Sequence, residues 1–417
     1  MMRPVVLIPG IGGSVLVKQG QTHKKFFRQK LIDNRWINLT PFSKRSVARW
    51  KDDMTYGVRR DPATKRITGF DGYESRGIVP YDIGGTAGVK DLVSEVLLLN
   101  QKQQDDIENI YQSRYFHALC EALYAKGYAD GKTLVGLPYD FRLVLDPEYR
   151  RRLFNTFRVY IERAVADARR ESGADGAVVV AHSLGALLFK WFLSSGDVGP
   201  DWIAENVAHF VSLCAPYGGA PNSIKACVAG EHYIPMFQQV FQEELQYNSG
   251  IIMCFPNRIG TLGSDVLYEL QAGGGGGEGG GRARPADPDK TREIRLGDYA
   301  DLAAGGAIPF EIWRDLYEPH IAVVEKRVAV PTTAVLTVNV ATEARFKARK
   351  LSAYPYDTSY GYGDGVVPAR SLKSYRKLFA GDETEELLIS GGNHAKLISD
   401  PRVCRLVLRR AQGDGKK

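Results

Sequence analysis

Cysteine is scarce in this sequence. Five cysteines occur among 417 residues, and no two of them stand in a C-x-x-C arrangement. An odd, dispersed set excludes a disulfide framework and lacks the ligand spacing of a zinc site. We therefore expect no metal, and we predict buried thiols at Cys120, Cys214, Cys227, Cys254 and Cys404.

Long apolar runs are also missing. No uninterrupted apolar stretch approaches the roughly 18 residues that a membrane-spanning helix needs. The first residues, Met1-Met2-Arg3, lead directly into Pro4–Pro9 (PVVLIP), which is too short for the apolar core of a signal peptide. The expectation is a cytoplasmic protein without a signal peptide or a transmembrane segment, whose contact with membranes is peripheral.

The composition itself is that of a soluble globular protein, with 44% hydrophobic and 25% charged residues. The chain is long enough for one elaborated domain or for a core with a cap. Its formal charge of +7 favours an anionic partner, either a nucleic acid or a negatively charged lipid surface. A basic soluble protein without such a partner would carry the same charge.

Residues 177–186 (AVVVAHSLGA) are the most informative stretch. A β-branched run, Val178–Val180, precedes Ser183, and a helix-like segment follows it. This is the pattern of a nucleophile elbow, in which a serine occupies a sharp strand-to-helix turn between small residues. Here Ala181 replaces the first glycine of G-x-S-x-G, and Gly185 keeps the second. A buried serine that caps a helix is the alternative interpretation.

A glycine-rich turn follows the first apolar run, within Pro4–Leu16 (PVVLIPGIGGSVL). It has neither of the glycine patterns that cradle phosphate groups. An oxyanion-hole loop after an early strand needs such glycines, because they let backbone amides point at one spot. We favour this interpretation over an ordinary turn and predict the amides of Ile11 and Leu184 as the two donors.

Apolar patterns along the chain predict alternating strands and helices. This order is typical of an α/β protein with an open, mostly parallel sheet and helices on both faces. Strands are expected at Val5–Pro9, Thr133–Gly136, Val178–Val180, Val207–Cys214 and Pro331–Val340, and helices within 107–127, at 150–171 and at Ala395–Arg410.

A serine nucleophile needs a base and a carboxylate that orients the base. In the α/β-hydrolase arrangement these residues follow in the order Ser, Asp or Glu, His. His394 is the one histidine of seven beyond Asp364, which stands between two glycines in a predicted tight loop. We therefore predict the triad Ser183, Asp364 and His394, with Asp357 as the alternative acid. His182 is expected to point the wrong way, and His209 lies in mid-strand.

Three further segments carry weaker predictions. Residues 18–75 mix basic and aromatic side chains, which suits single-stranded nucleic acid, a lipid interface or an ordinary surface over a core. The triad makes lipid the better of the first two, so no nucleic-acid partner is expected. Residues 231–247 are rich in aromatic side chains, as expected for a lid over an apolar cleft. The glycine tract 273–281 is predicted to be a disordered loop.

Taken together, the motifs resemble the lecithin:cholesterol acyltransferase family, and most closely its plant cytosolic phospholipase A branch. The match covers nearly the whole chain with the motifs in order. They are Pro4–Leu16, Pro138–Arg142 (PYDFR), Val180–Gly185 (VAHSLG), Val211–Pro221 (VSLCAPYGGAP), Gly363–Pro368 (GDGVVP) and His394–Val403 (HAKLISDPRV).

The resemblance implies an α/β-hydrolase core with a membrane-binding subdomain and a cap with a lid. The PYDFR segment would support the site, with Asp140 and Arg142 as a buried ion pair. Residues 18–110 contain no cysteine, so the lid disulfide of secreted members is absent, which argues against lipoprotein binding and sterol esterification. The implied boundaries are 1–19, 111–221 and 331–417 for the core, 20–110 for the lipid-binding subdomain, and 222–330 for the cap, with a disordered loop at about 273–290.

The implied function is cleavage of a fatty acyl ester of glycerophospholipids through an acyl-Ser183 intermediate. Water or a lipid alcohol would accept the acyl group, and no cofactor is needed. The expected partners are a phospholipid membrane surface and the lipid substrate. The alternatives are a soluble carboxylesterase on neutral esters and a non-catalytic lipid-binding protein.

Overall fold

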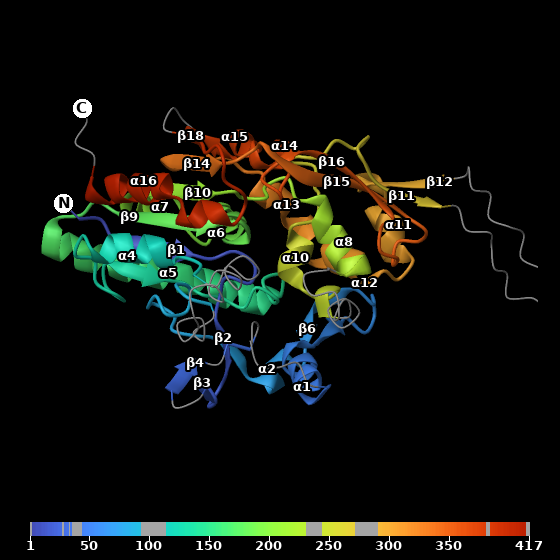
Figure 1. Ribbon diagram of the computed structural model, residues 1–417, viewed down its shortest axis with the longest axis horizontal. Coiled ribbons are helices and arrows are strands. Elements are labelled where there is room, and N and C mark those ends of the chain that lie inside the picture. Colours follow the sequence, from blue (N-terminus) through green and yellow to red (C-terminus); the bar gives the residue numbers. More distant parts are fainter. Residues whose placement is uncertain are drawn as a thin grey trace, which may run out of the picture.

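The computed structural model describes residues 2–26, 29–32, 34–35, 44–92, 114–230, 244–271, 291–380 and 384–413. Its centre is a sheet in the order β18-β14-β10-β9-β1-β8, in which every adjacent pair is parallel (Figure 1). The strands are β1 (Val5–Ile8), β8 (Leu134–Gly136), β9 (Ala177–His182), β10 (Val207–Leu213), β14 (Thr332–Leu336) and β18 (Thr384–Leu388).

Strand β9 lies in the interior of this sheet, between β1 and β10. All six of its residues are buried, as expected for a strand in a parallel sheet that is covered on both faces. The β-branched run Val178–Val180 suits this position, because branched side chains pack well on a pleated surface. Ser183 is the first residue after the strand.

Helices pack on the sheet in two groups. Helix α16 contacts both α4 and β9, whereas α5 and α6 share aromatic contacts such as Phe154 with Trp191, whose ring centroids are 5.9 Å apart. The parallel strands and the strand–serine–helix connection from β9 to α6 confirm the predicted α/β-hydrolase fold. The helices next to this sheet are α4 (His117–Tyr124), α5 (Pro147–Ser172), α6 (Leu184–Ser194), α7 (Pro200–Asn206) and α16 (Pro401–Gln412).

The C-terminal helix begins later than predicted. Instead of one helix over Ala395–Arg410, the structure has a short 3₁₀ turn, η5 (Lys396–Ser399), and then α16 from Pro401. Proline is favoured in the first turn because its missing N–H would be unpaired there in any case. Asp400 caps the helix by accepting a hydrogen bond from the Arg402 amide. This break leaves His394 on a loop.

A second sheet has the strand order β12-β11-β15-β16. Its strands are β11 (Val266–Gln271), β12 (Thr291–Arg295), β15 (Val340–Ala348) and β16 (Asp357–Gly363). Strands β11 and β12 precede residue 330 in the sequence, and β15 and β16 follow it. This sheet therefore crosses the boundary at which the sequence predicts the cap to end. The predicted strand Pro331–Val340 is therefore divided: β14 ends at Leu336, and Val340 begins β15.

Shorter elements connect these sheets. Two-stranded pairs are β2 (Leu16–Lys18) with β7 (Ile78–Pro80), β3 (His23–Phe26) with β4 (Gln29–Ile32), β5 (Gly57–Arg60) with β6 (Ile67–Asp71), and β13 (Val328–Ala329) with β17 (Phe379–Ala380). The remaining helices are α1 (Lys44–Met54), α2 (Tyr73–Arg76), α8 (Pro221–Ala229), α10 (Ser249–Met253), η3 (Leu296–Asp298), α11 (Tyr299–Ala304), α12 (Ile308–Ile312), η4 (Trp313–Tyr317), α13 (Glu318–Val324), α14 (Ala369–Leu372) and α15 (Tyr375–Leu378).

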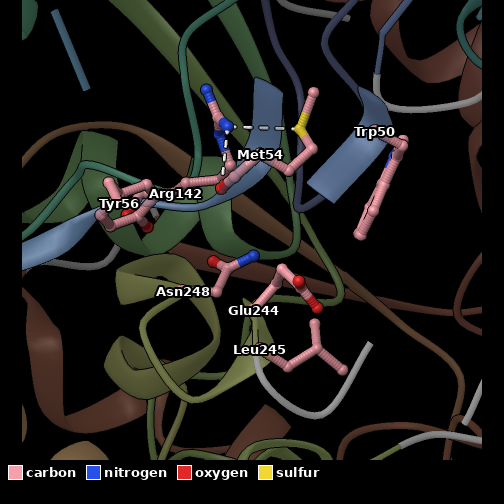
Figure 2. Close-up of a pocket in the computed structure, with 7 residues that line it drawn as sticks. All are labelled: Trp50, Met54, Tyr56, Arg142, Glu244, Leu245 and Asn248. Carbon is pink, nitrogen blue, oxygen red and sulfur yellow. Dashed lines mark hydrogen bonds between the residues drawn. The ribbon is translucent and has the colours of Figure 1, made fainter. Parts of the chain in front are cut away.

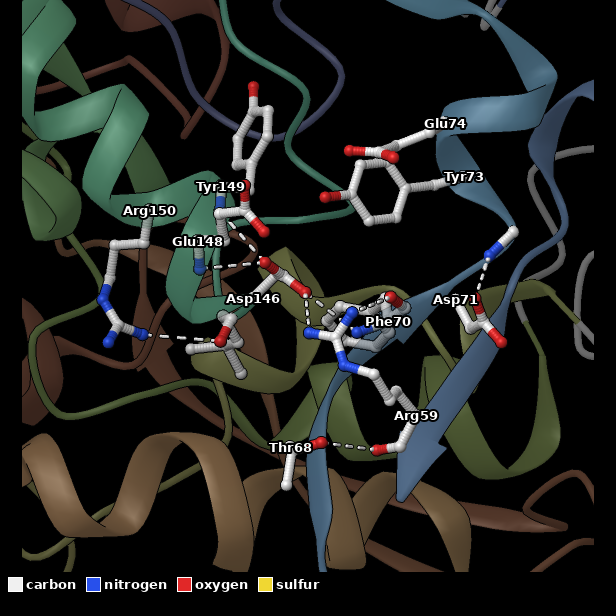
Figure 3. Close-up of polar contacts among 12 residues, drawn as sticks. Arg59, Thr68, Phe70, Asp71, Tyr73, Glu74, Asp146, Glu148, Tyr149 and Arg150 are labelled. Carbon is white, nitrogen blue, oxygen red and sulfur yellow. Dashed lines mark hydrogen bonds and ion pairs between the residues drawn. The ribbon is translucent and has the colours of Figure 1, made fainter. Parts of the chain in front are cut away.

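Asp146 joins the β5–β6 hairpin to the core (Figure 3). One oxygen of its buried carboxylate caps α5 by accepting from the amides of Glu148 and Tyr149. The other accepts from the amide of Phe70 at 2.9 Å and lies 3.7 Å from the Arg59 guanidinium. One side chain therefore fixes both the start of a core helix and a strand of the predicted lipid-binding subdomain.

Several sequence predictions fall wholly or partly outside the described residues. These are the glycine tract 273–281, most of the lid segment 231–247, residues 107–113 of a predicted helix, and part of the basic–aromatic region 18–75. All five cysteines are buried free thiols, as predicted. Within the described parts of the chain, no helix is both long and apolar enough to cross a membrane.

Candidate active site

Ser183 has the backbone conformation of an elbow. Its φ of 53° and ψ of −124° lie in a region that non-glycine residues rarely occupy and that is concentrated at functional sites. Gly185 makes the turn feasible, since a β carbon there would lie 2.2 Å from the carbonyl oxygen of Pro9. The serine side chain makes no capping bond to α6, so it does not act as the helix cap of the alternative interpretation.

The three predicted triad residues come together although they are far apart in the sequence. The Ser183 Oγ atom lies 3.0 Å from His394 Nε2, and His394 Nδ1 lies 2.7 Å from Asp364 Oδ2. Because a carboxylate only accepts hydrogen bonds, Nδ1 carries the imidazole proton and Nε2 accepts from the serine hydroxyl. This is the arrangement that a base needs to remove the hydroxyl proton.

Asp364 is held in the ionised state by its surroundings. Its second oxygen accepts hydrogen bonds from the amides of Val366 and Val367. Burial by itself raises the pKa of this carboxyl, but the charge and hydrogen bond of His394 and the two amides together lower it below its usual value. The alternative acid, Asp357, is exposed at the other end of β16.

A second set of hydrogen bonds links the histidine loop to the glycine-rich loop. His182 Nε2 donates to the carbonyl oxygen of His394 at 3.0 Å, and His182 Nδ1 pairs with the Tyr115 hydroxyl. That hydroxyl in turn accepts from the amide of Gly10 at 2.8 Å. Burial, followed by the charge of His394, lowers the pKa of His182 to about 3, so the ring is neutral at physiological pH.

Sequence reasoning missed this arrangement. His182 does not reach the serine, as expected, but its ring supports the loop that carries the base. Tyr115 gave no recognisable pattern, because its two partners lie in segments distant from it in the sequence. The position of His182 directly before the serine was the one available hint.

The glycine-rich loop lies against the serine. A β carbon on Gly10 would be 2.9 Å from the β carbon of Ser183, so a larger residue would push the two apart. Leu184 begins α6, where backbone N–H groups and the helix dipole favour negative charge. In the described chain, neither the Ile11 amide nor the Leu184 amide donates a hydrogen bond to another residue. Both remain predicted oxyanion donors.

Among the described residues, Cys214, Asp364 and His394 bring possible metal-ligand atoms within 4.8 Å of one another. Both oxygens of the carboxylate already accept hydrogen bonds, and one of these comes from the histidine. Burial, followed by the charge of Asp364, raises the pKa of the Cys214 thiol, whereas a metal would require the thiolate. These donors fit a triad with a neighbouring thiol, and they do not fit a metal site.

Arg142 is a structural cation. It forms the predicted buried ion pair with Asp140, at 2.6 Å, and its guanidinium also bonds the backbone oxygen and the sulfur of Met54 (Figure 2). Glu244 in the same pocket lies 3.9 Å from Lys51. The pocket that Arg142 helps to line therefore has internally paired charges. Its lining residues are Trp50, Met54, Tyr56, Arg142, Glu244, Leu245 and Asn248.

Comparisons with known proteins agree with the motifs. The family model described as lecithin:cholesterol acyltransferase (LCAT) matches residues 104–272, a region that includes Ser183. Over this region the chain resembles that family. The chain is 27% identical over 241 residues to lecithin-cholesterol acyltransferase-like 4 of Arabidopsis thaliana, and the match covers 58% of this chain and 39% of that protein. It is also 27% identical over 235 residues to the human lysosomal phospholipase A and acyltransferase, covering 55% and 50%.

The match to these curated relatives spans about half of their length or less. These plant and mammalian relatives match at the same identity, so the resemblance does not distinguish the plant branch. Among solved structures, the Tle4-Tli4 complex aligns over 98% of both chains with a TM-score of 0.49 and 13% identity.

Proposed function

We propose that this protein is a serine-dependent lipid acyl hydrolase or acyltransferase of the phospholipase A type. The hydrogen-bonded series Ser183, His394, Asp364 carries the proposal, because a serine at an elbow beside an imidazole and a buried carboxylate serves nucleophilic catalysis. The lipid substrate is supported by relatives whose names describe a phospholipase A and acyltransferase and a phospholipase A(1).

In the first half-reaction, Ser183 Oγ attacks the carbonyl carbon of a fatty acyl ester while His394 Nε2 takes the hydroxyl proton. The amides of Ile11 and Leu184 donate to the oxyanion that forms. When the intermediate collapses, the ester C–O bond breaks and His394 returns the proton to the leaving lysolipid oxygen. Asp364 stays ionised and stabilises the imidazolium.

In the second half-reaction, an acceptor hydroxyl attacks the acyl-Ser183 ester. His394 removes the acceptor's proton and then delivers it to Ser183 Oγ as the acyl–enzyme bond breaks. Water as the acceptor releases a fatty acid, whereas a lipid alcohol yields a new ester. The same residues serve both outcomes, so the acceptor that reaches the site decides between them.

The proposal is tested by incubating the protein with vesicles of phosphatidylcholine and diacylglycerol and identifying the products by mass spectrometry. Ser183→Ala should lower product formation by roughly 10⁴-fold or more. Ser195→Ala is the matched control, because Ser195 follows the same helix and bonds Asp197, away from the triad. It should retain activity.

The products separate the alternatives. Serine-dependent lysolipid and fatty acid indicate a phospholipase, and serine-dependent triacylglycerol indicates an acyltransferase. Turnover of a soluble ester without turnover of vesicles would replace the lipid proposal with a carboxylesterase. Vesicle binding with no serine-dependent product on any ester would leave a non-catalytic lipid-binding protein.

A further inference from the structure

The β15–β16 hairpin begins and ends at the loop that carries Asp364. Val340, the first residue of β15, pairs with Gly363 and also forms a bridge with Asp364. The connecting turn, residues 349–356, is therefore the end of the hairpin farther from the triad. Figure 1 shows β15 and β16 side by side, on the side of the molecule away from β2 and β6. The hairpin is thus separate from the lipid-binding subdomain predicted for residues 20–110.

Three tyrosines on this hairpin have largely exposed side chains. Tyr356, Tyr360 and Tyr362 are 57%, 62% and 78% exposed. Tyr360 and Tyr362 lie two positions apart in β16, so they point to the same side of the strand, and Tyr356 directly precedes that strand. Within the described chain, none of them stacks on another ring or bonds through its hydroxyl. Three uncovered aromatic rings in a row mark an interaction surface.

The same hairpin is positively charged. From Val340 to Gly363 it carries four basic residues, Arg345, Lys347, Arg349 and Lys350, and two acids. Glu343 is neutralised by Lys225 at 2.7 Å, whereas Arg345 and Lys347 lie 3.1 Å and 3.7 Å from Glu269 of β11. The basic charge without an acidic partner is therefore in the turn. Arg349 and Lys350 are exposed in the turn, and neither forms an ion pair with any residue that the structure describes.

We propose that the exposed face of the β15–β16 hairpin binds an anionic phospholipid surface. Tyrosine suits the boundary between headgroups and acyl chains, since its ring is apolar and its hydroxyl is polar. The basic turn complements acidic headgroups. This inference rests on the proposed lipid function and deepens it, because the bound surface would lie beside the loop that holds the catalytic acid.

A second copy of the chain is the competing occupant, because β16 is an edge strand and edge strands can pair. Two-fold pairing of two β16 strands would be antiparallel and would place the turn of each copy at the Gly363 end of the other. Such pairing would leave Arg349 and Lys350 without an acidic partner on β16, which has only Asp357. The charge of the hairpin therefore favours the anionic surface.

Binding is measured separately from catalysis, by flotation of the full chain carrying Ser183→Ala with phosphatidylcholine vesicles that contain or lack phosphatidylserine. One variant adds Tyr356→Ser, Tyr360→Ser and Tyr362→Ser, and another adds Arg349→Glu and Lys350→Glu. The control adds Val159→Ser and Leu388→Ser, which replace comparably exposed apolar side chains on α5 and β18. In parallel, the same changes are made with Ser183 intact to follow hydrolysis of a soluble short-chain ester.

The tyrosine variant should bind both kinds of vesicle about tenfold more weakly, and the charge-reversal variant should lose the preference for phosphatidylserine. The control variant should bind normally, and hydrolysis of the soluble ester should be unchanged in all three. Unaltered vesicle binding by the tyrosine variant would overturn the proposal, as would a parent protein that binds no vesicles. Conversion of a dimer to a monomer by the tyrosine changes would identify a second copy as the occupant instead.

The two proposals fail in distinguishable ways. Loss of the hairpin's role would leave serine-dependent hydrolysis of the soluble ester intact. Failure of the proposed function would leave the parent protein without serine-dependent products from phospholipid vesicles, while flotation would still measure vesicle binding by the hairpin.

Discussion

The imidazole of His182 donates a hydrogen bond from Nε2 to the carbonyl oxygen of His394, at 3.0 Å. The residue next to the nucleophile therefore supports the backbone of the base. Because the other nitrogen of His182 pairs with Tyr115, which also holds Gly10, the hydroxyl of Tyr115 connects both loops that flank Ser183.

Replacing this hydroxyl should impair catalysis more than substrate binding. Tyr115→Phe leaves the Gly10 amide and His182 Nδ1 without their partner, which we expect to lower kcat about tenfold through misplacement of the two loops. Steady-state kinetics on a soluble ester would measure kcat and KM separately. Tyr128→Phe is the control, because it removes a tyrosine hydroxyl bond to the Arg3 carbonyl, away from the site. Equal kinetics for the two variants would contradict a positioning role for Tyr115.

The tight approach at Gly185 predicts a steep cost for a single methyl group. In Gly185→Ala the new β carbon would overlap the carbonyl oxygens of Pro9 and Ile8, so the elbow must move. We expect a loss of about 2 kcal/mol or more in the free energy of unfolding and loss of activity, measured by urea denaturation and ester hydrolysis. Gly199→Ala has open space around its β carbon and should change neither. A stable, active Gly185→Ala protein would refute the close-packing argument.

The two roles of Asp146 predict that two substitutions of it lower the free energy of unfolding by different amounts. Asp146→Ala removes the cap of α5 and the acceptor of the Phe70 amide together, so the free energy of unfolding should fall by about 2–3 kcal/mol. Asp146→Asn can still cap the helix with one oxygen and should lose less. Urea denaturation of both variants checks this order, and equal losses would show that the cap contributes little.

Lys190 predicts a pH dependence of stability. This buried lysine on α6 bonds the carbonyl oxygens of Val324 and Lys326, and no carboxylate among the described residues pairs with it. Burial lowers its pKa to about 7. Between this value and the ordinary lysine pKa, the unfolded state binds more protons than the folded state, so the free energy of unfolding rises with pH.

The effect is measured against Lys190→Met. Relative to this variant, the free energy of unfolding of the parent protein should rise by about 1–2 kcal/mol between roughly pH 7 and pH 8.5. Urea denaturation at the two pH values provides the comparison. A constant difference between the proteins would mean that Lys190 keeps its proton throughout this range.

The sequence by itself determined much of this protein. The apolar runs specified five of the six central strands, because a strand buried on both faces needs continuous hydrophobic side chains. The edge strand β18 (TEELL) is only partly buried and was not predicted. The elbow pattern and the chain order selected Ser183, Asp364 and His394, which the fold then brought into contact. These features depend on local composition and on order along the chain, which a sequence displays directly.

Other features were decided only by the tertiary structure. The division of the Pro331–Val340 strand follows from the pairing of β15 with β11 and β16, and the support of His394 by His182 and Tyr115 requires three separate segments to meet. The exposure of Tyr356, Tyr360 and Tyr362 likewise depends on what packs against the hairpin. Contacts between distant segments leave no periodic pattern in the sequence, because they are fixed by the packing of the whole chain.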